Sequence, residues 1–241
     1  MNKLFLKYNV PGPRYTSYPT VPYWEDTPSE QGWLEHLKAA LKNAKGKNIG
    51  GALYIHIPFC ESLCSYCGCN TRITRNHSVG LPYIQTVLDE WKIYIGSIQN
   101  FPLSELHLGG GTPTFLSAAE LTTLINGILK YCSLVNDAEF SIEVDPRVTT
   151  LDHLKTLADL NFCRLSMGIQ DFDPHVQEIV HRVQSEEKVS FILNSSRSLG
   201  FDSINYDLIY GLPFQTQESI KKTMSIVCSH KPDRIAFYAY A

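Results

Sequence analysis

The sequence lacks any long hydrophobic run. None of its segments approaches the roughly 18 consecutive apolar residues that suggest a membrane-spanning helix. Its beginning, MNKLFLKYNV, also lacks the extended apolar stretch of a secretory signal peptide. We therefore expect a cytoplasmic protein that does not associate with a membrane.

Positive charge is also scarce. The chain has 21 Lys and Arg residues against 24 Asp and Glu residues, which gives a formal net charge of -3. Proteins that bind DNA or RNA usually present a basic face or stripe. The charge balance therefore argues against a nucleic-acid partner.

Low-complexity tracts, flexible linkers and longer internal repeats are missing as well. What remains is an alternation of short apolar runs with helical stretches, which is typical of a parallel α/β sheet. The predicted strands are Ala52–Ile57, Glu105–Leu108, Glu139–Val144, Arg164–Met167, Ser203–Ile209 and Arg234–Tyr238. The predicted helices are 30–44, 81–98, 117–131, 150–160, 187–199 and 216–229.

Six strand–helix units favour an open, partial barrel over a closed one with eight strands, because no helix follows the sixth strand. We predict this barrel for residues 49–241 and an N-terminal extension with one helix for residues 1–48. We expect that Ala241 is not a natural end. Ligands of such folds bind at the carboxyl ends of the strands, so the residues that follow each strand are the candidate site.

Four of the seven cysteines fall between Cys60 and Cys69, which argues against a disulfide framework. Cys60, Cys64 and Cys67 directly follow the first predicted strand with the spacing CxxxCxxC. Three thiolates on a short loop can surround one corner of an iron–sulfur cube. The spacing therefore predicts a 4Fe–4S cluster held by these three cysteines.

Other interpretations of the cysteines remain open. A structural zinc site usually combines two CxxC pairs, or one such pair with two histidines, and no second pair is present. Cys69 would make an ordinary electron-transfer cluster if it were a fourth ligand, although its CxC spacing from Cys67 is awkward. We interpret Cys132, Cys163 and Cys228 as small buried residues.

Glycine and polar residues occupy the other predicted strand ends. The run LHLGGGTPT, residues 106–114, would let a ligand approach the backbone closely and would leave amide donors free for an amino-acid ligand. Taken alone, it is also typical of a tight turn. Further candidates are Glu143, Asp145, Gln170, Asp171 and Asp207 at strand ends, Arg182, and the aromatic residues Tyr54, His56 and Tyr66. A strand-end carboxylate can equally cap the next helix.

The cysteine spacing followed by the glycine run resembles the radical S-adenosylmethionine (SAM) superfamily. Longer strings narrow the resemblance. These are RYTSYPT at 14–20, YIHIPFC at 54–60, CGCN at 67–70, GGGTPTFL at 109–116, IEVDPR at 142–147, RLSMGIQDF at 164–172 and DLIYGLP at 207–213. Together they resemble the oxygen-independent coproporphyrinogen III oxidase family, over roughly the first half of its usual chain.

This resemblance implies an α/β fold, a partial (βα)6 TIM-like radical SAM barrel with an N-terminal extension, without the family's C-terminal domain. Cys60, Cys64 and Cys67 would ligate the cluster, SAM would complete the fourth iron, and Cys69 would not be a ligand. Two SAM molecules would bind. Tyr54, Gly110 and Glu143 would contact the first. Tyr66, Gly111, Thr112, Gln170, Arg182, Asp207 and Ala241 would contact the second. The family commonly has Phe at the position of Tyr66, so an aromatic ring is preserved.

The resemblance also implies a reaction. A 5'-deoxyadenosyl radical, rather than a protein side chain, would take hydrogen from a propionate of coproporphyrinogen III, and loss of carbon dioxide and one electron would leave a vinyl group. Two such steps yield protoporphyrinogen IX for heme biosynthesis. We expect a flavodoxin- or ferredoxin-like electron donor and a monomeric protein. Arg14, Arg72 and Arg75 are candidates for binding the substrate carboxylates.

Two alternatives remain. A heme chaperone of the same superfamily has a similar cysteine loop, but it typically lacks the RYTSYPT opening and the fourth cysteine. A plain iron–sulfur electron carrier would not need the glycine run and would not bind SAM.

Overall fold

The structure is a computed structural model that describes residues 3–8, 23–25, 28–44 and 49–240. Its centre is one sheet in which all neighbouring strands are parallel, in the order β1-β4-β5-β6-β7-β8. The strands are β1 (Gly51–Ile57), β4 (Phe101–Gly110), β5 (Cys132–Val144), β6 (Phe162–Gln170), β7 (Ser203–Tyr210) and β8 (Arg234–Ala239). The predicted partial barrel of six parallel strands is therefore confirmed.

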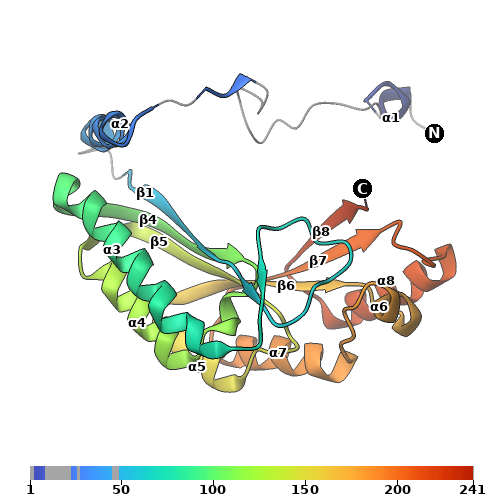
Figure 1. Ribbon diagram of the computed structural model, residues 1–241. Coiled ribbons are helices and arrows are strands. Elements are labelled where there is room, and N and C mark those ends of the chain that lie inside the picture. The colour runs from blue at the N-terminus through green and yellow to red at the C-terminus, as the bar shows by residue number, and fades with distance from the viewer. Residues whose placement is uncertain (1–2, 9–22, 26–27, 45–48, 241) are drawn as a thin grey trace.

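Helices cover one face of this sheet (Figure 1). They are α3 (Gly80–Ile98), α4 (Ala118–Leu129), α5 (Leu151–Asp159), α6 (Pro174–Ile179), α7 (Glu186–Ser198) and α8 (Gln217–His230). Two more helices, α1 (Lys3–Tyr8) and α2 (Glu30–Ala44), precede β1, and short 3-10 helices occupy His77–Val79 and Pro113–Phe115. No helix among the described residues is long and apolar enough to cross a membrane. The division of the chain at residue 48 stays a prediction.

The two faces of the sheet differ because side chains alternate along each strand. On β5, Phe140, Ile142 and Val144 are buried in the main hydrophobic core, whereas Ser141 and Glu143 between them are half-buried. Parallel strands covered on both faces would be apolar throughout. The period-two pattern therefore leaves a polar inner face, and this face carries the candidate site.

Side-chain caps begin several helices where the sequence turns out of a strand. Ser117 and Glu120 form a capping box at the start of α4, as their spacing predicts. Equivalent reciprocal caps begin α5 at Thr150 and α8 at Thr216. Each cap satisfies amide groups that the first helical turn leaves without a partner. The helix starts are thereby fixed next to the carboxyl ends of the strands.

The cysteine loop runs from Pro58 to Thr71, between β1 and α3. Its base is closed by two short parallel strands, β2 (Phe59–Cys60) and β3 (Arg72–Ile73). The amide of Thr74 also donates to the carbonyl oxygen of Cys60 at 2.9 Å. Strands of two residues have no hydrophobic period, which explains why the sequence does not reveal them.

Three sequence-based assignments differ from the structure. Helices α1 and α6 were not predicted, because six residues are too few to establish a helical period. Cys132 and Cys163 are half-buried, and Cys228 is exposed, so the interpretation of these three cysteines as buried residues is wrong. The thiols of Cys132 and Cys163 donate to backbone carbonyl oxygens at 3.4 and 3.7 Å.

The capping box of α4 gives a first testable prediction. Replacing Ser117 with Ala removes the acceptor for the Glu120 amide and is expected to lower the free energy of unfolding by about 1 kcal/mol. Ser117→Thr keeps a hydroxyl at the same position and is the matched control. Urea unfolding followed by circular dichroism measures both variants, and an equal loss of stability in the two would contradict the capping role.

Candidate functional site

A cavity of about 160 Å³ lies beneath the cysteine loop at the carboxyl ends of the strands. We call it the cysteine cavity. All of the predicted cluster ligands and SAM contacts among the described residues line it except Tyr54. They are Cys60, Cys64, Tyr66, Cys67, Gly110, Gly111, Thr112, Glu143, Gln170, Arg182 and Asp207. Residues that are far apart in sequence are thus brought to one place, because parallel strands end at the same edge of the sheet.

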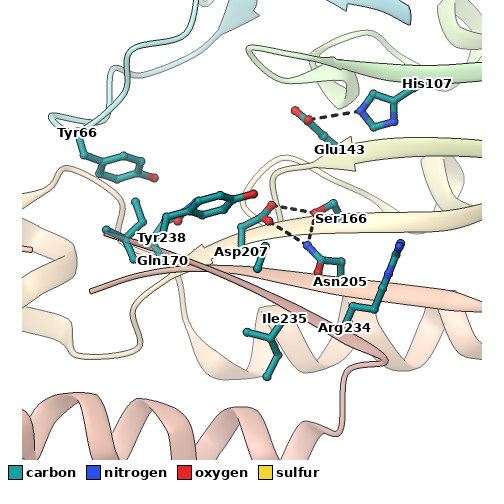
Figure 2. Close-up of a pocket in the computed structure, with 12 residues that line it drawn as sticks. Tyr66, His107, Glu143, Ser166, Gln170, Asn205, Asp207, Arg234, Ile235 and Tyr238 are labelled. Carbon is teal, nitrogen blue, oxygen red and sulfur yellow. Dashed lines mark hydrogen bonds and ion pairs between the residues drawn. The ribbon is translucent and has the colours of Figure 1, made fainter. Parts of the chain in front are cut away.

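A second, larger cavity of about 730 Å³ adjoins the first along the inner face of the sheet. We call it the inner cavity. The two cavities share Tyr66, Glu143, Gln170 and Asp207. Figure 2 shows these shared residues together with further lining residues that the sequence did not single out, which are His107, Ser166, Asn205, Arg234, Ile235 and Tyr238. The joint space is large enough for a small-molecule ligand.

The cysteine thiols have different surroundings. The Cys60 Sγ lies 3.3 Å from Thr112 Oγ1, and burial raises the pKa of Cys60. A hydrogen bond from the Cys69 thiol lowers the pKa of Cys67 to about 6, and the same bond raises the pKa of Cys69. Metals and clusters bind thiolates rather than thiols. Cys67 is therefore prepared to act as a ligand at neutral pH, whereas Cys69 keeps its proton.

Two cations lie beside the third thiol, one buried and one half-buried. Cys64 Sγ accepts contacts from Arg182 Nη1 at 3.6 Å and from Arg147 Nη2 at 3.8 Å. Both guanidinium groups also bind Asp145 Oδ2, at 3.2 Å from Arg182 and 2.7 Å from Arg147. We call these three side chains the Arg147–Asp145–Arg182 network. Burial alone would raise the pKa of Asp145, but the two guanidinium groups more than offset it, so the pKa lies below its usual value.

The cysteine cavity fits an iron–sulfur cluster by its chemistry. Soft thiolates from Cys60, Cys64 and Cys67 face one space, and positive charge lies beside it. Across the part of the chain that the structure describes, no three His, Cys, Asp or Glu side chains converge as ligands of a metal ion would. Each thiolate of a cubane cluster binds a different iron, so its ligands surround the cluster instead of converging on one point.

The glycine run is required by close packing against the cysteine loop. Gly110 has φ +117°, in the left-handed region that favours glycine, and a Cβ there would lie 2.9 Å from the His56 ring. At Gly111, a Cβ would lie 2.9 Å from the Phe59 carbonyl oxygen and 3.0 Å from Cys60 Sγ. The end of β4 can therefore pass directly under the first cysteine with its backbone open to the cavity.

Glu143 connects the glycine run to a row of aromatic side chains. Its Oε2 accepts a hydrogen bond from the Gly110 amide at 3.3 Å, and its Oε1 lies 3.4 Å from His107 Nε2. Tyr54 stacks on His107 with ring centroids 5.7 Å apart, and its hydroxyl lies 2.9 Å from His56 Nδ1. Tyr54 and His56 lie on the same side of β1. Tyr54 does not line the cysteine cavity, but it contacts His107, which in turn contacts Glu143 in the cavity wall.

Asp207 is held by its neighbours on the inner face. Ser166 Oγ donates to Asp207 Oδ2 at 2.8 Å, and Asn205 Nδ2 donates to Oδ1 at 2.9 Å (Figure 2). Burial raises the pKa of Asp207 although these two hydrogen bonds lower it. Next to it, Gln170 has φ +68° at the end of β6, where the register with β7 shifts. At this bend in the backbone the side chain of Gln170 lines both cavities.

Asp171 and Arg182 are buried, unlike typical strand-end or helix-surface residues. Asp171 accepts hydrogen bonds from Thr223 and Gln215 and lines neither cavity, so it supports the fold and does not face the barrel mouth. Arg182 is 8% exposed, and its Nη2 donates to the Gly168 carbonyl oxygen at 2.7 Å. Arg182 is therefore not a solvated residue of a helix surface.

A small apolar cluster ties the cysteine loop to the segment around α6. Tyr66 packs against Val176, Val180 and Leu212, and the Ser65 amide donates to the Val180 carbonyl oxygen at 3.1 Å. Burial raises the pKa of Tyr66, so its hydroxyl stays protonated. This cluster is separate from the main core. The loop is therefore anchored at two places, by Phe59 in the main core and by Tyr66 in this second cluster.

Several residues of the two cavities were not predicted from the sequence, and some predicted residues are not found there. Arg147 follows Asp145 by two residues, and that short spacing was the available signal for their ion pair. His107 and Ser166 offered no signal beyond their position on polar faces of strands. Arg14 and Ala241 lie outside the described residues. Arg72 and Arg75 are exposed and line neither cavity.

Comparisons with known proteins agree with this geometry. Residues 54–227 match the family described as the radical SAM superfamily. The oxygen-independent coproporphyrinogen III oxidase of Escherichia coli K12 is 42% identical over 238 residues, which cover 99% of this chain and 51% of that protein. The protein of the same name from Pseudomonas aeruginosa PAO1 is 39% identical, with coverage of 99% and 52%. The chain thus spans about half the length of the curated relatives it matches.

Solved structures give the same picture. The Escherichia coli coproporphyrinogen III oxidase, described as a radical SAM enzyme, superposes with a TM-score of 0.86 and 39% identity, covering 100% of this chain and 52% of that one. Methylornithine synthase superposes with a TM-score of 0.54 at 14% identity, covering 89% of this chain and 61% of that one. The second similarity concerns the fold alone.

The close approach at Gly111 gives a prediction for cluster assembly. Gly111→Ala places a methyl group against the Phe59 carbonyl and Cys60 Sγ, so it is expected to displace the cysteine loop and reduce cluster incorporation. Gly96→Ala is the matched control, because nothing lies within 4 Å of a Cβ at that position. Iron and sulfide per chain, measured after anaerobic reconstitution, test this. Equal incorporation in the two variants would refute the steric argument.

The depressed pKa of Asp145 predicts a pH dependence of stability. The folded pKa lies below the unfolded value of about 4, so ionised Asp145 stabilises the fold above that pH and the contribution is lost as the pH falls through the folded pKa. Asp145→Asn is expected to cost about 3–5 kcal/mol at pH 7, because two buried guanidinium groups lose their partner.

Urea unfolding of the cluster-free protein at pH values from about 7 to 3 measures this difference, which should shrink at acidic pH. A gap between wild type and Asp145→Asn that stays constant with pH would show that the carboxylate does not contribute through its charge.

Proposed function

The chain belongs to the radical SAM superfamily, and on that premise we propose that Cys60, Cys64 and Cys67 hold a 4Fe–4S cluster at which SAM is cleaved. The superfamily itself implies a cluster and SAM as cofactors. When bound and reduced, the cluster supplies the electron that splits SAM into methionine and a 5'-deoxyadenosyl radical. The observation that carries the proposal is the convergence of the three thiols and the residues Gly110–Thr112 on one cavity.

The chain's own residues would bind and orient SAM. The exposed backbone at Gly110 and Gly111 suits the amino and carboxylate groups of an amino acid. Glu143, Gln170 and Asp207 supply acceptors along the wall shared by the two cavities, where ribose hydroxyl or ammonium groups can donate to them. We propose two SAM molecules, because the shared wall lets one space continue into the other.

We further propose that the substrate is coproporphyrinogen III. The relatives that support this are named oxygen-independent coproporphyrinogen III oxidases. The reaction would be an oxidative decarboxylation of two propionate groups to vinyl groups, which gives protoporphyrinogen IX. A flavodoxin- or ferredoxin-like donor would supply the electron for each SAM cleavage, and each propionate radical would lose carbon dioxide and pass one electron to a separate acceptor. For the substrate carboxylates, Arg14, Arg72 and Arg75 remain proposals, and Arg234, which lines the inner cavity, is a further candidate.

The first experiment separates the cofactor chemistry from the substrate. The protein is reconstituted anaerobically with iron and sulfide, reduced with dithionite and given SAM, and 5'-deoxyadenosine is quantified. Wild type is expected to form 5'-deoxyadenosine, and Cys64→Ala should abolish both the cluster and the product. Cys69→Ser is the matched control, because it removes the thiol but keeps a hydrogen-bond donor for Cys67, and a thiol that is not a ligand can be removed with the cluster retained.

The outcomes distinguish the alternatives. An intact cluster that yields no 5'-deoxyadenosine favours an electron carrier. Loss of the cluster in Cys69→Ser, which keeps the hydrogen-bond donor for Cys67, would identify Cys69 as a fourth ligand and lead to the same conclusion. Product formation from SAM without conversion of added coproporphyrinogen III, together with binding of heme, favours the chaperone.

A further inference from the structure

Cys64 differs from the other predicted ligands in its charged surroundings. Two guanidinium groups lie within 4 Å of its Sγ, whereas the thiol of Cys60 has the neutral Thr112 hydroxyl as its side-chain contact. Arg182 is nine-tenths buried, with a side-chain exposure of 10%, and the side chain of Arg147 is 20% exposed. The Arg182 charge has little contact with water, and the Arg147 charge is partly shielded from it. Both therefore act on the sulfur through a medium that screens weakly.

The Arg147–Asp145–Arg182 network carries an unbalanced charge. Two guanidinium groups share a single carboxylate, so one net positive charge remains next to Cys64. The other acidic groups of the cysteine cavity do not form ion pairs with these arginines. Glu143 accepts from the Gly110 amide, and Asp207 accepts from Ser166 and Asn205. A buried charge without a counter-ion is costly. The arrangement is therefore explained if a negatively charged group occupies the cavity.

We propose that Arg147, anchored by Asp145, is a positioning residue that raises the reduction potential of the cluster bound through Cys64. This inference rests on the proposed function, because it requires the cluster. Reduction transfers one electron from the donor to the cluster, and no bond forms or breaks in that step. The added negative charge is stabilised by a nearby cation, and hydrogen bonds to ligand sulfurs raise the potential in the same direction.

The role of Arg147 can be tested separately from that of its neighbour Arg182. Arg182 is one of the predicted SAM contacts, and its Nε and Nη2 both donate to the Gly168 carbonyl oxygen. Arg147 binds Asp145 with Nε and Nη2 and approaches Cys64 with Nη2. A change at Arg147 therefore alters the charge beside the sulfur while the contacts of Arg182 to the backbone remain.

Arg147 also has a structural contact that an experiment must control for. Its Nη1 donates to the His181 carbonyl oxygen at 3.4 Å, next to the segment that anchors the cysteine loop. Loss of this contact alone would loosen the loop in any variant without the guanidinium. A charge effect and a bracing effect are distinguished by Arg147→Lys, which keeps the charge but not the planar fork of donors.

The test is a redox titration of reconstituted protein with dithionite, followed by electron paramagnetic resonance of the reduced cluster. Arg147→Gln is expected to reduce the equilibrium constant for reduction about tenfold, which is a shift of about 59 mV to lower potential for a one-electron couple. Arg147→Lys should stay near the wild-type potential. Arg164→Gln removes an arginine that pairs with Glu139 away from the cysteines and should leave the potential unchanged.

The sign of a second shift gives an independent check. Asp145→Asn removes the negative charge of the network, so the potential should rise, opposite to the effect of Arg147→Gln. A purely structural role predicts changes in the same direction for both variants, or equal changes in Arg147→Lys and Arg147→Gln, and either result would overturn the proposal. Should Arg147→Gln fail to incorporate a cluster, the other two variants decide. Arg147→Lys is then expected to keep the wild-type potential and Asp145→Asn to raise it, and a lower potential in both would overturn the proposal.

The titration also keeps the two proposals apart. Wild-type protein that binds no reducible cluster contradicts the proposed function. Wild-type protein with a normal cluster, whose potential is unaffected by Arg147→Gln, contradicts the role of Arg147 alone.

Discussion

Parallel pairing of the six strands is the constraint on which the site depends. The carboxyl ends of all six strands lie at the same edge of the sheet. Groups that are far apart in the sequence therefore meet there, namely the cysteine loop after β1, the glycines of β4, Glu143 of β5 and Asp207 of β7. The helices cover the opposite, apolar face and supply the buried area that stabilises the fold (Figure 1). Stability and chemistry are thus assigned to different faces of one sheet.

At the site itself, several charged groups are largely shielded from water. Asp145 is 6% exposed and binds two guanidinium groups, and the raised pKa of Asp207 reflects its burial. Such groups are tolerated because each has several hydrogen bonds of good length. A rigid polar wall of this kind can orient a ligand without rearranging first.

The sequence predicted the features that depend on local pattern. Strands appear as apolar runs, the cap of α4 appears as Ser117 and Glu120, and the cysteine spacing marks its loop. The convergence of the predicted ligands also follows, because parallel strand order fixes which loops meet. Pairing between distant side chains does not follow from pattern. Nothing along the chain indicates that Arg182 pairs with Asp145, or that Tyr54 reaches Glu143 through His107.

The part of the cysteine loop around Tyr66 is held outside the main core, and this affects how the site opens. Tyr66 belongs to the small cluster of Val176, Val180, Leu212 and Ile209, so this part of the loop can open locally while the main core stays intact. A group that binds the closed loop and not the open one shifts that local equilibrium by mass action. Amide hydrogen exchange at Ser65, whose N–H binds Val180, therefore reports occupancy of the cavity as well as folding of the loop.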